Sequence, residues 1–390
     1  MVEARTDTGS GRIRLGMVGG GEGAFIGAVH RMAARLDGHY DLVAGALSST
    51  PEKALRSAQA LGLDPRRSYP DYETMARAEA RRKDGIEAVA IVTPNHVHVP
   101  AARAFLKRGI HVICDKPLAT SLKEAQSLAA AAAKSSAILA VTYNYTGYPM
   151  VRQASEMIAA GELGVVRVVQ VEYPQDWLTQ ALEETGQKQA EWRTDPARAG
   201  GGGCLGDIGT HAFQLAEFVS GLEVEAVSAD LASFVAGRRL DDNVSALLRF
   251  SGSARGQLWA SQVAPGNENG LRLRIYGEAG GLDWSQEQPN QLRWSPFGDA
   301  TRIISRGTGA AGPAASRVTR IPSGHPEGYI EAFATTYGEI AHAIRVARSG
   351  ASPDPAAWHP GLRDGLRGLA FVEAALASSR RDGRWQRVAA

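Results

Sequence analysis

Residues 13–30 read IRLGMVGGGEGAFIGAVH, an apolar run followed by a glycine cluster and then by an apolar, alanine-rich segment of helical period. The apolar run is typical of a buried parallel strand. Gly19 permits a tight turn after that strand, and Gly21 lets the backbone approach a pyrophosphate with no Cβ in the way. Gly27 is the next well-placed glycine, so the usual GxGxxG spacing is stretched by about three residues. Because a helix N-terminus offers unpaired N–H groups to phosphates, the turn predicts a dinucleotide site, with a plain glycine loop as the alternative.

Strand-like and helix-like segments alternate after this turn. The strand-like runs are 13–18, 41–47, 87–93 and 111–117, and the helix-like runs are 51–63, 99–109 and 121–135. Parallel strands need helical crossovers, so this rhythm predicts a parallel sheet with helices on both faces. We therefore assign residues 1–143 to an α/β, dinucleotide-binding Rossmann domain.

The bulk composition is that of an ordinary globular protein. A chain of 390 residues suits two domains, because single cores rarely grow beyond about 250–300 residues. The formal net charge is +2 and basic residues occur only in short clusters, so we expect no nucleic-acid partner. Two separated cysteines, Cys114 and Cys204, exclude a disulfide scaffold and a CxxC metal site.

The chain carries no obvious targeting or membrane signal. Residues 1–12 are polar and lack the apolar core of a signal peptide. No apolar run reaches the roughly 18–20 residues needed to span a bilayer. We therefore expect a cytoplasmic protein without a membrane partner.

The sequence favours NAD over NADP only weakly. An acid at the end of the second strand normally binds the adenosine ribose. Here that strand ends in Ser48 and Ser49, which can accept a ribose hydroxyl or donate to a 2′-phosphate. NAD is the predicted cofactor, and NADP stays open.

Two further segments follow strands of the predicted sheet, where ligands bind in open α/β folds. One is TPNHVHVP, which begins with Thr93, Pro94 and Asn95. The other is Asp115-Lys116-Pro117, where proline favours an extended conformation for Lys116. A lysine at this place can hold a substrate oxygen and stabilise negative charge that develops on it, although a lone lysine is more often only solvated.

Residues 144–390 show a different pattern. After a helix-like segment at 150–164, strand-like runs cluster without intervening helices, and they lie at 165–173, 225–233, 243–251, 254–263 and 271–277. This clustering predicts an antiparallel sheet in an α+β substrate domain.

The segment 200–211 reads GGGGCLGDIGTH and precedes a helix-like run. Asp207 and His211 are four residues apart, so on a helical turn they share a face. From the residues alone, an N-cap and a satisfied structural histidine remain alternatives for this pair.

With these motifs in view, the chain resembles the Gfo/Idh/MocA family of sugar and inositol oxidoreductases. The resemblance rests on the glycine turn with His30, on TPNHVHVP, on DKP where most members have Glu-Lys-Pro, and above all on GGGGCLGDIGTH. It implies a C-terminal domain with a large, open, mostly antiparallel sheet that often forms dimers or tetramers. It also implies that Lys116, Asp207 and His211 meet in the active site, and that His98 shapes the nicotinamide pocket.

Chemistry then suggests roles for the three active-site residues. Oxidation of a secondary alcohol needs a base, and histidine, with a pKa of about 6.5, is the natural candidate at His211. Lys116 would donate to the reacting oxygen, and Asp207 would hold neighbouring hydroxyls. The hard step belongs to the cofactor.

Further residues are predicted to line the substrate site. Tyr143 and Asn144 follow a strand and either line the nicotinamide side or only pack. Trp192 and Arg193 offer an aromatic face and a cation to a polyol, and His325 lies in a loop before a helix. His96 and His98 are close together but lack a third ligand at suitable spacing, so we expect no metal.

Three functions fit these residues. The first is a dehydrogenase that oxidises a cyclic polyol or sugar to a ketone or lactone. The glycine turn, DKP and the HPEGY segment resemble most the family members that act on scyllo-inositol, related cyclic polyols or sugars such as L-glucose. The second is an enzyme that oxidises a sugar transiently, eliminates or exchanges a group, and returns the hydride without net cofactor turnover. The third is a non-enzymatic sugar sensor that keeps the nucleotide fold, which the presence of Lys116, Asp207 and His211 together disfavours.

Overall fold

The computed structural model describes residues 11–389, which form two compact units. The first unit comprises the described residues up to Ala119, Lys123–Asn144 and Tyr329–Gly365. The second comprises Thr120–Leu122, Tyr145–Gly328 and the described residues from Leu366. The sequence-based division placed all of 144–390 in the substrate domain, whereas the structure groups 329–365 with the first unit. Most of the polar segment 1–12 lies outside the described residues.

The first unit contains the predicted parallel sheet, which the structure confirms. Its elements are β1 (Ile13–Gly19), α1 (Phe25–Leu36), β2 (Tyr40–Ala46), α2 (Pro51–Ala60), α3 (Tyr72–Glu79), β3 (Ala88–Val92), α4 (His98–Leu106), β4 (His111–Cys114), α5 (Leu122–Ala132), β5 (Leu139–Val141) and α11 (Tyr329–Ser349). The strands lie in the order β2-β1-β3-β4-β5, and every pair is parallel. An isolated parallel bridge between Gly45 and Ser68 extends the sheet beyond β2.

This strand order places the chemistry of the first unit. The order in which successive strands are added to the sheet reverses between β1 and β3, which are neighbours: β2 lies on one side of β1, and β3 to β5 follow on the other. Ligands of open α/β sheets bind at such a switch point, beyond the carboxyl ends of the strands. The glycine turn after β1 and the Thr93–Asn95 segment after β3 both lie at this edge.

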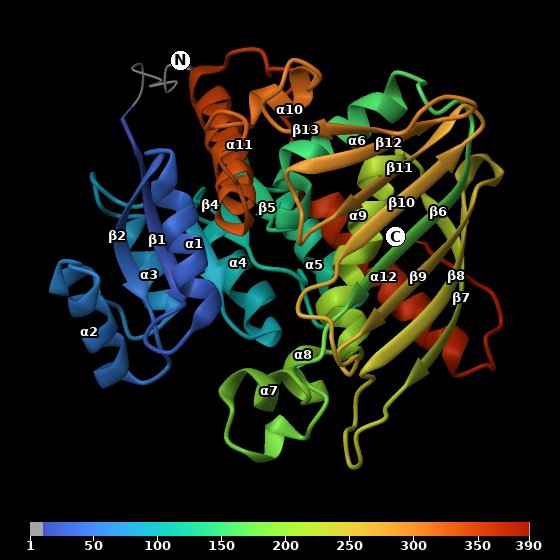
Figure 1. Ribbon diagram of the computed structural model, residues 1–390. Coiled ribbons are helices and arrows are strands. Elements are labelled where there is room, and N and C mark those ends of the chain that lie inside the picture. Colours follow the sequence, from blue (N-terminus) through green and yellow to red (C-terminus); the bar gives the residue numbers. More distant parts are fainter. Residues whose placement is uncertain (1–10, 390) are drawn as a thin grey trace. The chain divides into compact units, whose positions relative to one another are not determined.

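Helix α11 belongs to the first unit because its apolar face completes the core there. It packs beside α1 (Figure 1). Phe333, Tyr337 and Ile340 of α11 share one buried cluster with Ile13 and Met17 of β1. A helix buries its apolar stripe wherever a complementary surface exists, whatever its distance along the chain.

The second unit is built on the large sheet. Its elements are α6 (Pro149–Ala159), β6 (Val166–Pro174), α7 (Lys188–Arg193), α8 (Pro196–Ala199), a π-helical turn (Leu205–Gly209), α9 (Thr210–Ser220), β7 (Val224–Ala232), β8 (Asn243–Phe250), β9 (Arg255–Ser261), β10 (Arg272–Gly277), β11 (Gly280–Ser285), β12 (Gln291–Pro296), β13 (Arg302–Ser305), α10 (Pro313–Arg317), α12 (Leu362–Ser379) and β14 (Gln386–Arg387). The strand order is β13-β12-β11-β10-β6-β9-β8-β7-β14, and β6 with β9 is the one parallel pair among the described strands of this second sheet. The predicted mostly antiparallel sheet is therefore confirmed.

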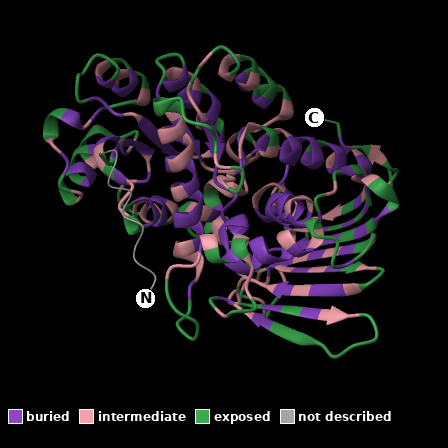
Figure 2. Cartoon of the chain, turned by 90° about the horizontal axis from the view of Figure 1, so that it is seen from above, coloured by how far each residue is buried: buried purple, intermediate pink, exposed green. Residues whose placement is uncertain are grey.

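One face of this sheet is covered and the other is not. Along β8, buried and exposed residues alternate, as a strand with one solvated face requires, and Figure 2 shows this banding on the strands. Helices α6, α9 and α12 lie on the covered face (Figure 1). The contrast leaves a broad sheet surface without helices. None of the helices within residues 11–389 is long and apolar enough to cross a bilayer.

Candidate active site

The glycine turn has the geometry that dinucleotide phosphates require. Gly19 and Gly20 have φ angles of +78° and +71°, which favour glycine strongly. A Cβ on Gly27 would lie 2.5 Å from the carbonyl oxygen of Gly20, so the turn and helix α1 pack backbone to backbone. The N-cap residue of α1, Ala24, offers no side-chain hydrogen bond to the first N–H groups. Those donors and the helix dipole suit an anion at this end.

Close packing also requires a glycine at position 21. A Cβ there would lie 2.5 Å from the carbonyl oxygen of Leu47 and 2.7 Å from the Ser57 hydroxyl. The N–H of Gly21 donates to that same carbonyl at 3.1 Å. The stretched glycine loop is thus fastened to the end of β2, directly before Ser48 and Ser49. Ser48 is half-buried and accepts from the Thr50 N–H, and Ser49 is exposed.

His98 connects the two loops that follow β3 and β4. Its Nδ1 lies 2.8 Å from the carbonyl oxygen of Pro117, and its Nε2 lies 2.9 Å from that of Thr93. Burial lowers the pKa of His98, while Asp115 and the two carbonyls act in the opposite direction. The structure therefore gives His98 a task the sequence did not show, which is to hold the TPNHVHVP and DKP loops together.

Asp115 orients the backbone next to Lys116. Its Oδ1 accepts from the Lys116 N–H at 3.0 Å and from the Thr142 hydroxyl at 2.9 Å, and it lies 3.8 Å from Nε2 of His30. Burial opposes ionisation of Asp115, but the neighbouring His30 imidazole and the charge of Lys116 outweigh it and lower the pKa. The Lys116–Pro117 bond is cis. Asp115 thus contributes to the site by fixing where the half-buried Lys116 begins.

Two buried polar atoms at the ends of β3 and β5 have no hydrogen-bond partner among the described residues. They are the Thr93 hydroxyl and the Asn144 side-chain nitrogen. Buried polar groups are rarely left unsatisfied unless a ligand completes them. Both lie on the edge that carries the glycine turn, so the residues present fit a bound dinucleotide. Asn95 and Tyr143, at the same edge, are also buried.

In the second unit, Asp207 and His211 lie on consecutive helical turns. Asp207 is part of the π-helical turn, where the Thr210 N–H reaches back to the carbonyl of Leu205. π-Helical turns are rare in proteins, and those that occur are often found at functional sites. His211 follows in the first turn of α9 and is 7% exposed. The spacing prediction that both residues share a helical segment is therefore supported by the backbone.

Neighbouring side chains fix both groups. Gln262 donates to Oδ2 of Asp207 at 2.9 Å, and Nε of Arg193 lies 3.3 Å from the same oxygen. The ring of Tyr145 meets the His211 ring edge to face, with 4.9 Å between centroids. The Tyr145 and Tyr173 hydroxyls are hydrogen-bonded to each other. The carboxylate and the imidazole are thus held in defined orientations.

The remaining predicted residues are placed differently. The Arg193 guanidinium lies over the Trp192 ring, 4.3 Å from its centroid, so these two side chains form one cation–π unit that also contacts Asp207. His325 is exposed, and its backbone carbonyl accepts a hydrogen bond from Arg306. Substrate contact by Trp192 and His325 stays a prediction.

Sequence reasoning missed Gln262 and Tyr145. Gln262 follows β9 and Tyr145 follows Asn144, where the segment Lys123–Asn144 of the first unit ends, and neither belongs to a recognisable motif. Gln262 lies 55 residues from Asp207 along the chain, so no spacing rule connects them. Among residues 11–389, no group of three or more metal-ligating side chains lies together.

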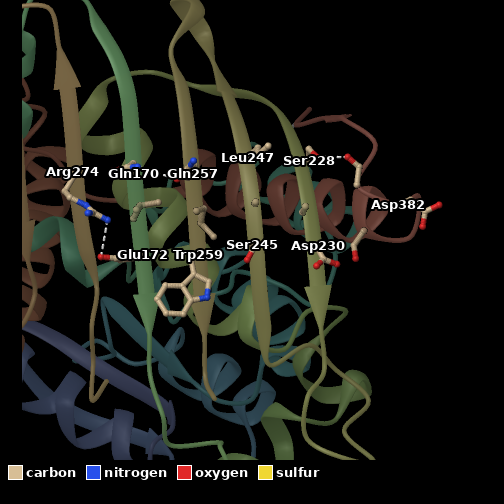
Figure 3. A pocket seen from close by; sticks show the side chains of 16 residues that line it. Gln170, Glu172, Ser228, Asp230, Ser245, Leu247, Gln257, Trp259, Arg274 and Asp382 are labelled. Carbon is tan, nitrogen blue, oxygen red and sulfur yellow. Dashed lines mark hydrogen bonds and ion pairs between the residues drawn. The ribbon is translucent and has the colours of Figure 1, made fainter. Parts of the chain in front are cut away.

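A pocket is found on the uncovered face of the large sheet. Glu172, Trp259 and Arg274 are among the residues that line it, and Arg274 is paired with Glu172 (Figure 3). It lies on the sheet face opposite the buried side chains of β6, which point toward the helices.

Comparisons with known proteins agree with this geometry. A family described as oxidoreductases with an NAD-binding Rossmann fold matches residues 13–143, and the GFO/IDH/MocA C-terminal domain matches residues 151–283. A crystal structure of an oxidoreductase from Sinorhizobium meliloti is 57% identical, with a TM-score of 0.89 over 97% of this chain and 100% of that one. An inositol dehydrogenase homolog from Azotobacter vinelandii, complexed with NADH and myo-inositol, is 37% identical, with a TM-score of 0.90 over 97% and 98%. Levoglucosan dehydrogenase of Pseudarthrobacter phenanthrenivorans is 28% identical over 72% of this chain and 75% of its own length.

Proposed function

The chain belongs to the Gfo/Idh/MocA family of NAD-binding oxidoreductases, and we propose that it oxidises a secondary hydroxyl of a cyclic polyol or sugar. The observation that carries the proposal is the pairing of Asp207 and His211 on one helical segment, with the carboxylate bracketed by Gln262 and Arg193. A carboxylate that two neighbouring side chains hold in one orientation suits the recognition of adjacent hydroxyl groups on a substrate. The relatives named for inositol and levoglucosan support this class of substrate.

The residues of the first unit would hold NAD. The glycine turn and the N-terminus of α1 suit its pyrophosphate, and Ser48 and Ser49 suit its adenosine ribose. Thr93 and Asn144 offer unsatisfied polar atoms to the nicotinamide end. When bound there, NAD would supply the hydride acceptor for oxidation of the carbinol carbon.

The chain's own residues handle the proton and the charge. His211 removes the hydroxyl proton, and its edge-to-face contact with Tyr145 limits rotation of the ring. Lys116 donates a hydrogen bond to the reacting oxygen while negative charge develops on it. Asp207 accepts from the hydroxyls beside the reacting carbon. The O–H and C–H bonds break and a C=O bond forms, so the alcohol becomes a ketone, or a lactone when the carbon is anomeric.

Inositols and pyranoses are the substrates to test, because adjacent ring hydroxyls match a bracketed carboxylate and a nearby cation.

The test is a scan of the purified protein with NAD and NADP against inositols and pyranoses, followed at the absorbance of reduced nicotinamide. We expect net reduction of NAD by at least one cyclic polyol. Lys116→Ala should lower kcat by about 10²–10³-fold, as for other groups that stabilise developing charge. Its NADH affinity, measured by fluorescence titration, should stay within about twofold, because the phosphate contacts lie elsewhere.

Lys123→Ala is the matched control, because Lys123 is an exposed lysine at the start of α5. It should leave kcat unchanged. Absence of reduction with every compound would contradict the proposed reaction, and full activity of Lys116→Ala would contradict the role of that lysine. Product formed without net reduction would instead point to transient oxidation.

We also propose that the uncovered face of the large sheet binds a second copy of this chain. Leu247 and Trp259 are 50% and 36% exposed on that face, and Arg249 lies directly opposite Arg255 across β8 and β9. Like charges placed opposite each other are destabilising unless an acid approaches them. Asp230 lies opposite Ser245, and Figure 3 shows both side chains. Arg249 lies four residues beyond Ser245 along β8, so Asp230 and the two arginines occupy different ends of the strands. A twofold rotation would bring the arginines of one copy toward the aspartate of the other.

A further inference from the structure

We propose that Asp241 is a positioning residue for the Asp207–His211 pair. The inference rests on the proposed function and names a residue outside every motif discussed so far. Asp241 lies between β7 and β8, two residues before the start of β8. It does not contact the predicted substrate groups, and acts through the backbone that carries them.

Asp241 accepts three successive backbone N–H groups. Its Oδ1 accepts from Gly203 at 2.7 Å, and its Oδ2 accepts from Leu205 at 2.7 Å. Its own carbonyl oxygen accepts from the Cys204 N–H at 2.8 Å. The helical segment that contains Asp207 begins at Cys204. Asp241 therefore caps this helix from another part of the chain, a role that a local Ser, Thr, Asn or Asp usually fills.

The glycine run before Asp207 has the shape that this cap requires. A Cβ on Gly203 would collide with the Asp241 carbonyl oxygen and lie 2.9 Å from Cβ of Leu240. Only glycine permits that approach without moving the strand. The carbonyl of Gly203 in turn accepts from the Asp207 N–H at 2.9 Å. The contact thus runs from Asp241 through residues 203–205 to the π-helical turn.

The same rim of the sheet also holds the Asp207 side chain. The N–H of Gln262 donates to the carbonyl of Asp242 at 2.9 Å, and the Gln262 side chain donates to Asp207 at 2.9 Å. The residues before β8 and after β9 therefore fix both the backbone and the carboxylate of the site. A rigid support of this kind sets where the imidazole of His211 stands on the following turn.

Keeping a carboxylate at this place is costly. Burial raises the pKa of Asp241 to about 6, although the Leu205 and Gly203 N–H bonds act to lower it. A neutral cap would avoid that cost. The carboxylate has two oxygens, each of which accepts one backbone N–H, whereas an amide side chain has only one acceptor oxygen.

Asp241→Asn tests the inference, because its amide nitrogen would face a backbone N–H, donor against donor. We expect kcat for the best polyol to fall at least tenfold at temperatures far below the unfolding midpoint. The NADH dissociation constant should stay within twofold, because the glycine turn belongs to the first unit. Hydrogen exchange of the full chain, followed by mass spectrometry, should become at least tenfold faster in the peptide that covers 203–211.

Glu217→Gln is the matched control. Glu217 is a partly buried carboxylate on α9, the helix that also carries His211. Its side chain accepts the Val224 N–H at 2.7 Å and pairs with Arg367. This variant should lower the unfolding midpoint comparably while kcat and exchange at 203–211 stay within twofold of the wild type.

The outcomes separate the two claims. Unchanged exchange at 203–211 in Asp241→Asn, or equal loss of kcat in both variants, would overturn the positioning role. If the wild type turns over no polyol, the proposed function fails, and the exchange measurement still decides whether Asp241 holds the segment.

Discussion

At the scale of single residues, several prominent polar groups bind backbone or fixed side chains. His98 spans two carbonyl oxygens, Asp115 accepts the Lys116 N–H, and Asp241 caps a helix begun 37 residues earlier, at Cys204. Each holds in place a segment that carries a predicted functional residue. Their task is to limit where Lys116 and His211 can stand, which a catalytic geometry requires.

Gly27 gives a test at this scale. Its missing Cβ allows helix α1 to pack on Gly20, and the three Gly20 atoms that a Cβ would contact are all backbone, so none can move aside alone. Gly27→Ala should push the helix N-terminus away from the phosphate position, and the NADH dissociation constant should rise about tenfold or more, the equivalent of about 1.4 kcal/mol. Fluorescence titration with NADH measures this.

Gly338→Ala serves as the comparison. Gly338 lies in α11 of the same unit, and a Cβ there would meet only the His39 ring at 3.6 Å, an ordinary contact. Helix propensity predicts that this variant gains up to about 1 kcal/mol and binds NADH normally. Equal affinity of both variants would refute the packing argument for Gly27.

At the scale of elements, the two most informative segments are the π-helical turn and α11. The turn adds a residue to the helix that carries Asp207, which changes the direction in which its side chain leaves. Helix α11 crosses over from the second half of the chain to complete the core of the nucleotide-binding unit. The core of the nucleotide-binding unit is therefore completed by a helix that lies nearly two hundred residues beyond the sheet it covers.

Ile340→Ala tests that contribution. Ile340 is fully buried in α11, and truncation of such a side chain costs about 2–5 kcal/mol. We expect the free energy of unfolding to fall by this amount, with NADH affinity retained at low temperature and lost earlier on heating. Calorimetry with and without NADH measures both.

The same substitution at Ile303, which is 62% exposed in β13, should change stability by less than about 0.5 kcal/mol. A small effect of Ile340→Ala would mean that α11 is dispensable for the first unit.

At the scale of the whole molecule, the uncovered sheet face is the surface that we propose binds a second copy of the chain. Light scattering should give at least twice the 41.4 kDa chain mass at micromolar concentration. Arg249→Glu should weaken association at least about tenfold by placing an acid opposite Asp230 of the second copy. Adding Asp230→Arg to the same chain should restore it, because the charges are then exchanged on both copies.

A monomeric wild type would exclude this interface. Failure of the double variant to recover, with both single variants folded, would mean that the two charges do not face each other across it.

The sequence by itself determined the domain types and the places of the motifs. Glycine conformations and the periods of strand and helix are local properties, so the turn at Gly19, the two sheets and the segment of Asp207 and His211 were readable from nearby residues. The family and the NAD cofactor followed from those motifs and are confirmed by the comparisons.

Only the tertiary structure decided which distant residues support the site. Gln262 and Asp241 reach the 203–207 segment because β8 begins and β9 ends beside it, and α11 joins the first unit because its apolar face fits there. Periodicity states which face of an element is buried but not what it is buried against. Contacts across tens of residues depend on how whole elements pack, and packing is a property of the folded chain.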